Sequence, residues 1–166
     1  KPVRISVAIS GRASGPLPAI RNGFGIERTL YALDGTPVAP DAPLKRGARY
    51  MVLIDGTTES QDQQQAMVID LLPAGLEIEN TRLVAGGSLQ DFGWLGELTP
   101  TETTEFRDDR FVAAVDLNAE RGQFRVAYLV RAVTPGTFIQ PATQVEDMYR
   151  PERLARTALS RVTVAE

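Results

Sequence analysis

The chain has 166 residues and a formal net charge of −3 at pH 7, and its arginines are scattered without forming a basic run, so a nucleic-acid partner is not expected. It contains no cysteine and no histidine. Their absence excludes disulfides, thiolate nucleophiles, Ser-His catalysis and metal sites built from Cys or His, and we expect neither a metal nor a cofactor.

The N-terminal part of the chain predicts extended segments separated by glycine turns. Apolar residues occupy every second position over residues 3–9, which is typical of a half-buried strand. A linker or turn follows in GPLP and RNGFG, where Asn22-Gly23 is well suited to positive φ. Residues 26–33 then predict a second strand, which ends at an Asp34-Gly35 turn.

The middle of the chain continues the same alternation of strand and turn. Residues 48–55 strongly predict a strand, closed by the Asp55-Gly56 pair. The polar segment TTESQDQQQ predicts a solvated loop or hairpin tip, with residues 66–72 as the returning partner strand. Pro73-Ala74-Gly75 permits a type II turn into a further strand over residues 76–83.

The C-terminal half adds more short strands and one irregular stretch. Residues 85–102 predict a long loop with one helical turn around residues 89–95. Only PERLARTAL suggests further helix, with Pro151 at its first position. Strands are predicted over residues 103–108, 110–117, 122–133, 136–149 and 160–166. Many short strands with closely spaced turn signals predict an all-β, antiparallel sandwich.

The densest charge cluster is EFRDDRF. Glu105, Asp108 and Asp109 would supply carboxylates for acid–base chemistry or a hard cation, but Asp108-Asp109 also suits a hairpin turn, which we favour. Without histidine, a serine nucleophile would need a lysine, and only Lys1 and Lys45 exist. We therefore do not expect an enzyme.

Two further features involve large side chains. Trp94, the single tryptophan, either anchors a partner or, as we favour, caps one end of the sandwich core. Met148 and Tyr149 are adjacent, and two neighbouring residues of one strand cannot both face inward. The pattern alone leaves burial of Met148 and presentation of the pair equally open.

Four motifs taken together resemble the C-terminal macroglobulin-like domain (MG10) of bacterial α2-macroglobulins. They are DLLPAGLEIEN, EFRDDRFVAAVDL, AYLVRAVTPGTF and VEDMYRPE, in this order. The resemblance covers residues 20–166 and implies an immunoglobulin-like, macroglobulin-type β-sandwich. Residues 1–19 would then be the tail of a preceding macroglobulin-like domain and a linker.

The resemblance also implies a function. Such proteins are large, periplasmic and often lipid-anchored to the inner membrane. They trap proteases, and a thioester in a separate helical domain bonds the trapped protease. Met148 and Tyr149 would pack over that thioester and shield it from water, as a non-catalytic lid. The expected partners are proteases, the thioester domain of the same protein and a peptidoglycan glycosyltransferase.

Two alternative functions remain open. One is an envelope-binding or adhesion module with no link to proteases, and the other is an accessory domain of a hydrolase. The chain has no cysteine, so it can guard a thioester but cannot form one.

Overall fold

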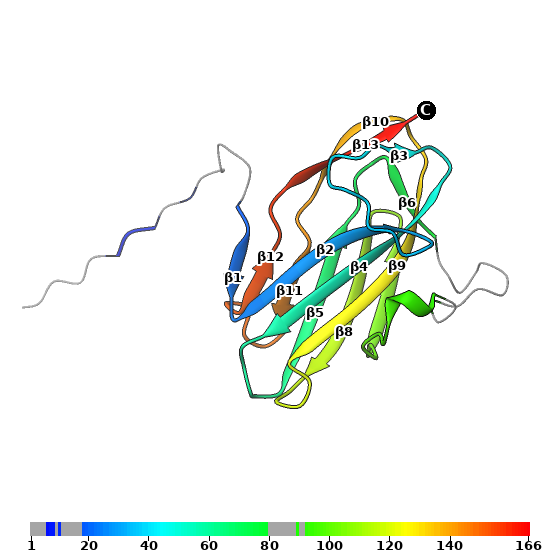
Figure 1. Ribbon diagram of the computed structural model, residues 1–166. Helices are drawn as coiled ribbons and strands as arrows, with labels where there is room; N and C mark the ends of the chain where they lie inside the picture. The colour runs from blue at the N-terminus through cyan, green and yellow to red at the C-terminus, as the bar shows by residue number, and fades with distance from the viewer. Residues whose placement is uncertain (1–5, 9, 11–17, 80–88, 90–91) are drawn as a thin grey trace, which may run out of the picture.

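Three β-sheets make up the fold (Figure 1), which we describe from a computed structural model covering residues 6–8, 10, 18–79, 89 and 92–166. The largest sheet has the strand order β1-β12-β11-β5-β8-β7. Its strands are β1 (Ile20–Asn22), β12 (Leu154–Arg156), β11 (Gln144–Asp147), β5 (Gln64–Leu71), β8 (Arg110–Leu117) and β7 (Thr103–Arg107). No helix in the described part of the chain has the length and apolar character needed to cross a membrane.

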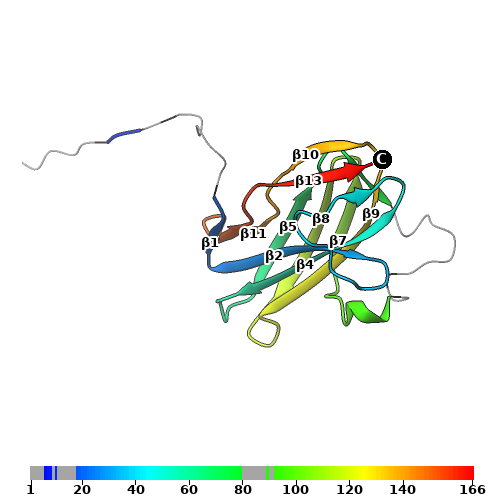
Figure 2. The ribbon, with the colours of Figure 1, turned by 45° about the horizontal axis from the view of Figure 1, so that its top comes forward.

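The second sheet packs against the first and has the order β2-β4-β9-β6. Its strands are β2 (Phe24–Ala32), β4 (Arg49–Thr58), β9 (Gln123–Ala132) and β6 (Leu76–Glu79). The third sheet consists of β10 (Gly136–Gln140), β13 (Ser160–Ala165) and β3 (Leu44–Lys45). It lies at the end of the sandwich where the chain terminates (Figure 2). Every pairing between these strands is antiparallel except that of β13 with β3, so the predicted all-β sandwich is confirmed.

The main core fills the space between the six-stranded and four-stranded sheets. In strands β5 and β8, buried residues alternate with residues that are half-buried or, at one end of each strand, exposed, as expected when one face of a sheet is covered. Large buried side chains come from both layers: Val68 and Phe111 from one, Phe24, Phe124 and Tyr128 from the other. The rings of Phe111 and Tyr128 stack with their centroids 4.5 Å apart and join the two layers.

Strand β9 is buried on both faces because a loop covers the outer face of the four-stranded sheet. Leu95, in the short 3₁₀ helix η2 (Gly93–Leu95), packs there on Met51 and Leu129. The ring centroids of Trp94 and Tyr31 lie 5.0 Å apart, and the indole N–H of Trp94 donates to the Leu33 carbonyl at 3.0 Å. The prediction that Trp94 caps one end of the main core is therefore wrong, because it covers a second, outer cluster.

Residues 151–159 do not form the predicted helix. They contain β12, which is paired on one side with β1 and on the other with β11. Ala155 in its centre is fully buried. Pairing on both sides satisfies the backbone polar groups of this short segment, so tertiary context overrides the local preference for helix.

Of the two alternatives for TTESQDQQQ, the solvated loop is confirmed over residues 59–63, whereas the hairpin with residues 66–72 is wrong. Strand β4 already pairs with β2 on one side and β9 on the other, so it has no free edge for β5. The connection instead crosses from the four-stranded to the six-stranded sheet, where β5 pairs with β11 and β8. A local sequence pattern identifies the strands here but not their partners.

Turn predictions had mixed outcomes. Gly23 has φ +77°, as predicted for the Asn22-Gly23 turn. The predicted Asp108-Asp109 turn joins β7 to β8. Gly75 lies in a turn closed by a hydrogen bond from Leu76 N–H to the Pro73 carbonyl, but it does not have the positive φ that a type II turn requires.

The strand predicted over residues 3–9 is not seen where it can be tested. Residues 6–8 belong to no strand, and Val7 is 78% exposed. Residues 3–5 and 9 of that segment lie outside the described residues. The division of the chain into residues 1–19 and 20–166 remains a prediction.

A candidate interaction loop at Met148 and Tyr149

Met148 and Tyr149 are the first two residues after β11 and begin the loop that leads to β12. β11 and β12 pair antiparallel, from Gln144 opposite Arg156 to Glu146 opposite Leu154. Met148 is 47% exposed and Tyr149 is 76% exposed. The alternative that Met148 is buried is therefore excluded, and both side chains are presented at the surface.

The buried carboxylate of Asp147 holds this loop in place. Its Oδ1 accepts hydrogen bonds from the backbone N–H groups of Tyr149 at 3.0 Å and Arg150 at 3.1 Å. Its Oδ2 accepts from Gln64 Nε2 and from Arg150 Nε, both at 3.0 Å. The Asp147 residue is only 1% exposed, so these partners replace water around the charge.

The electrostatics of Asp147 favour the ionised form. Burial by itself raises the pKa of this carboxyl, but the hydrogen bonds from Tyr149, Gln64 and Arg150 outweigh it and lower the pKa below its usual value. Asp147 is therefore a permanent anion at neutral pH.

The loop is also attached to the start of β5 and to the connection that precedes it. Met148 N–H donates to the Gln65 carbonyl at 2.8 Å, and Arg150 Nη2 donates to the Gln63 carbonyl at 3.2 Å. Within the loop, Arg153 N–H donates to the Arg150 carbonyl at 2.8 Å. The backbone around the pair is thus fixed, whereas the side chains of Met148 and Tyr149 project outward.

Two carboxylates of EFRDDRF are paired with neighbouring arginines. Glu105 accepts from Arg107 at 2.9 Å, and Asp109 accepts from Arg110 at 3.0 and 2.6 Å. These hydrogen bonds lower the pKa of both acids, whereas a general acid needs a raised pKa. The structural interpretation, a turn with neutralising arginines, is confirmed.

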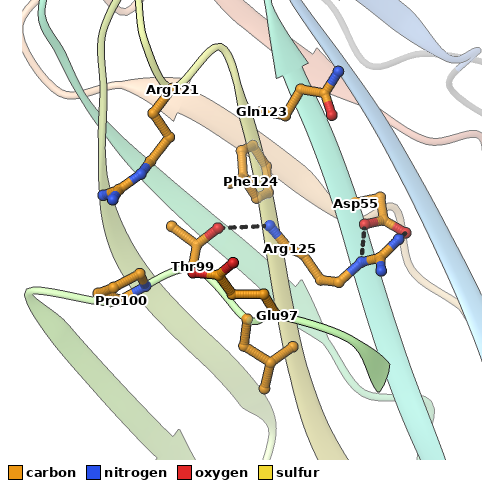
Figure 3. A pocket seen from close by; sticks show the side chains of 9 residues that line it. Asp55, Glu97, Thr99, Pro100, Arg121, Gln123, Phe124 and Arg125 are labelled. Atoms are coloured by element: carbon orange, nitrogen blue, oxygen red, sulfur yellow. Dashed lines mark hydrogen bonds and ion pairs between the residues drawn. The ribbon is translucent and has the colours of Figure 1, made fainter. Parts of the chain in front are cut away.

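A polar depression of about 420 Å³ lies on the four-stranded sheet, and Figure 3 shows the side chains that line it. Arg125 Nε donates to Asp55 Oδ1 at 2.7 Å, and Arg125 Nη1 donates to the Leu95 carbonyl at 3.2 Å. The backbone N–H of Arg125 donates to Thr99 Oγ1 at 2.9 Å. These groups satisfy one another and fasten the loop that carries Leu95, so we assign the depression a structural role.

A buried polar cluster between the sheets was not predicted. Asp70 on β5 accepts from Arg28 Nε at 2.8 Å, from the Tyr128 hydroxyl at 2.5 Å and from Thr143 Oγ1 at 2.7 Å. The sequence carries a signal for it. Asp70 falls on the same strand face as the buried Ala66 and Val68, where an acid requires partners.

Comparison with known proteins identifies the family. The family model for the bacterial alpha-2-macroglobulin MG10 domain matches residues 23–152. Curated relatives include the alpha-2-macroglobulins of Xylella fastidiosa, 40% identical over 153 residues, and of Escherichia coli, 40% identical over 147 residues. This chain belongs to the bacterial alpha-2-macroglobulin MG10 domain family.

Solved structures of relatives agree. E. coli alpha-2-macroglobulin activated by porcine elastase is 34% identical, with a TM-score of 0.78 over 94% of this chain. A native E. coli fragment that runs from domain MG7 to the C-terminus gives a TM-score of 0.76 over 92% of this chain. The predicted macroglobulin-type sandwich is thereby confirmed.

This chain is short compared with those relatives. It spans 9% of the X. fastidiosa and E. coli proteins, 14% of the elastase-activated chain and 25% of the native fragment. The activity of a whole alpha-2-macroglobulin therefore enters below as a proposal.

Proposed function

We propose that this domain serves a bacterial alpha-2-macroglobulin protease trap as a non-catalytic lid. Its Met148–Tyr149 pair covers a thioester carried by another domain of the same protein. The observation that carries this proposal is the presentation of two adjacent bulky side chains, 47% and 76% exposed, on a loop fixed by a buried carboxylate. A rigid loop loses little conformational entropy when a partner docks on it.

The chemistry of a thioester suits such a lid. A thioester is an activated acyl group, and excluding water protects it from hydrolysis. Methionine adapts to an irregular surface, and tyrosine adds a large apolar ring with one hydroxyl group for hydrogen bonding. The chain itself contains no cysteine, so the reactive group would belong to another part of the whole protein.

Relatives support a link to proteases and to acyl chemistry. Structures exist of E. coli alpha-2-macroglobulin activated by trypsin and by porcine elastase. The Salmonella protein has been crystallised after reaction with methylamine, a small amine nucleophile. For the whole protein we propose proteases as targets and the periplasm as location, with a lipid anchor in the inner membrane and a peptidoglycan glycosyltransferase nearby.

The test uses the whole protein that carries this domain. Its sequence should contain a Cys-x-Glu-Gln segment, and methylamine should release one thiol per molecule. In the double variant Met148→Ala/Tyr149→Ala, we expect the thiol to appear about tenfold faster, the equivalent of ~1.4 kcal/mol of lost protection. Ile139→Ala, which truncates another exposed apolar residue on β10, should react like the wild type.

Two outcomes would contradict the shielding role. One is a methylamine rate in the double variant equal to that of wild type and Ile139→Ala. The other is a whole protein that lacks the Cys-x-Glu-Gln segment and releases no thiol.

A further inference from the structure

We propose that the outer edge of β2 binds an extended peptide segment of another protein, which pairs with the β2 backbone and places an apolar side chain between the layers. β2 is the edge strand of the four-stranded sheet (Figure 1). A cleft of about 580 Å³ opens along this edge, between residues 27–30 of β2 and residues 160–162 of β13. Ligand pockets in proteins typically have volumes of roughly 300–1,000 Å³.

The chain itself covers only the last part of this edge. Val38 N–H donates to the Leu30 carbonyl at 2.8 Å, and Ala32 N–H donates to the Thr36 carbonyl at 2.9 Å. These bonds use the outward-facing peptide groups of Leu30 and Ala32. They show which residues of β2 direct their backbone away from β4.

The rest of the edge is open because the chain turns away from it. Ala42 N–H donates to the Ala39 carbonyl, and Pro40 within that turn has no N–H with which to continue the pairing. The peptide groups of Arg28, two residues before Leu30, face the same way, and no described residue hydrogen-bonds to them. An unpaired edge of this kind is a template for a strand from another chain.

The cleft continues from the edge into the space between the layers. Buried and half-buried apolar side chains line its inner part: Leu30, Val38, Leu44, Leu76 and Val162. Side chains of a strand alternate between its two faces, so a peptide paired with β2 directs every second side chain into the cleft. An apolar side chain there is removed from water together with the lining.

Two polar side chains in the lining have atoms without a hydrogen-bonding partner. Gln140 is only 6% exposed, and its Nε2 donates to the carbonyls of Leu71 and Pro141, which leaves its Oε1 without a donor among the described residues. Arg28 donates through Nε to Asp70, whereas its buried Nη2 has no partner in the described part of the chain. Because Asp70 already balances the Arg28 charge, a neutral peptide group, with one N–H and one C=O, suits the cleft better than an anion.

The test titrates the isotope-labelled 166-residue chain with two synthetic peptides and follows its amide resonances by NMR. The first probe is acetyl-Thr-Val-Thr-Val-Thr-amide. The second is the same peptide methylated on every backbone nitrogen, which keeps the side chains but removes the N–H donors. We expect saturable shifts of the Arg28 and Thr29 amides with the first probe and about tenfold weaker binding of the second.

Two variants that each add a ring separate the cleft from the surrounding surface. Ser160→Phe places the ring in the lining of the cleft, and Ile139→Phe places it on the exposed face of β10, outside the lining. Ser160→Phe should weaken binding of the first probe about tenfold, whereas Ile139→Phe should bind like the wild type. A dispersed amide spectrum verifies folding, and if Ser160→Phe fails to fold, the comparison of the two peptides still decides.

Several results would overturn the proposal. Absence of saturable shifts with the first probe, or equal affinity for both probes, rules out strand pairing at this edge. Unchanged affinity in a folded Ser160→Phe variant rules out the cleft. If the whole protein that carries this domain fails to bind a probe that the 166-residue chain binds, the edge belongs to a segment of the same protein. Shifts of the Arg28 amide that grow with chain concentration in the absence of peptide would assign the edge to a second copy instead.

Discussion

Asp147 is the residue on which the geometry of the Met148–Tyr149 pair depends. It immediately precedes the pair, and its two oxygens connect the backbone of the loop to Gln64 and Arg150. In the sequence it is one acid beside another, Glu146, and only its spacing of two residues from the apolar Val145 distinguishes it. The distinction arises because Asp147 faces inward from β11 and is buried, whereas Glu146 is half-buried on the outer face.

Replacing Asp147 tests this role. We expect Asp147→Asn to lower the free energy of unfolding by about 1–3 kcal/mol at pH 7, because the amide is uncharged and cannot accept on both atoms. Thermal or urea unfolding of the protein measures the loss. Asp62→Asn removes the other, more exposed acidic neighbour of Arg150 at 3.5 Å and should cost less than about 1 kcal/mol.

The pH dependence of the same variant follows from the lowered pKa of Asp147. A carboxyl with a lowered folded-state pKa contributes its stability above its unfolded pKa, near ~3.9, and loses that stability as the pH falls through the folded-state pKa. The difference in unfolding free energy between wild type and Asp147→Asn should therefore be full at neutral pH and shrink below about pH 4. A difference that stays constant down to strong acid would refute the ionic role.

At the scale of elements, the packing of β9 against β4 depends on a close contact between a ring and a glycine that the sequence does not predict. Asp55-Gly56 suggests a turn, yet Gly56 lies within β4, opposite Phe124 of β9. A Cβ at this position would lie 2.1 Å from the Phe124 ζ-carbon, so the ring occupies the space that a side chain would need. The glycine serves the packing of the core, and the strand continues through it to Thr58.

Gly56→Ala should therefore destabilise the domain by about 1–3 kcal/mol through overpacking. Unfolding in denaturant measures the change. Gly93→Ala is the matched control, because a Cβ there has no neighbour within 4 Å and the expected effect is under ~0.5 kcal/mol. Adding Phe124→Leu to Gly56→Ala should recover part of the loss, and strictly additive effects of the two substitutions would contradict the steric explanation.

At the scale of the whole molecule, the Asp70 cluster ties the two main sheets together. Asp70 belongs to β5 of the six-stranded sheet, whereas Arg28 and Tyr128 belong to β2 and β9 of the four-stranded sheet. Burial and the neighbouring Asp70 charge raise the pKa of Tyr128 well above its usual value, so its hydroxyl remains a donor. Burial lowers the pKa of Arg28, but Asp70 and Tyr128 outweigh it and leave that pKa raised.

Asp70→Ala should cost about 3–5 kcal/mol of unfolding free energy, because it leaves the Arg28 guanidinium without its carboxylate partner in the core. Asp55→Ala is the matched control. It also removes the carboxylate partner of an arginine, because Asp55 lies 2.7 Å from Arg125, compared with 2.8 Å between Asp70 and Arg28. The Asp55 and Arg125 side chains, however, are both more than a third exposed. The expected loss there is about 1 kcal/mol or less, and similar losses for the two variants would contradict the importance of burial.

The sequence by itself determined the fold class, the family and the place of the candidate loop. Period-2 alternation reports which face of a strand is buried, so the strands around Leu53, Val68 and Val126 could be located without a structure. The adjacency of Met148 and Tyr149 already required one of them to leave the interior. These properties are local, because they depend on neighbours along the chain.

The tertiary structure alone decided which strands pair and what holds the loop. Ala155 lies in a strand rather than a helix because β1 and β11 pair with the backbone of its segment on both sides. Asp147 and Asp70 acquire their roles from Gln64 and Arg28, partners 83 and 42 positions away along the chain. The pattern of a single segment indicates which face of a strand is buried, but it does not specify the distant residues that hydrogen-bond to these two acids.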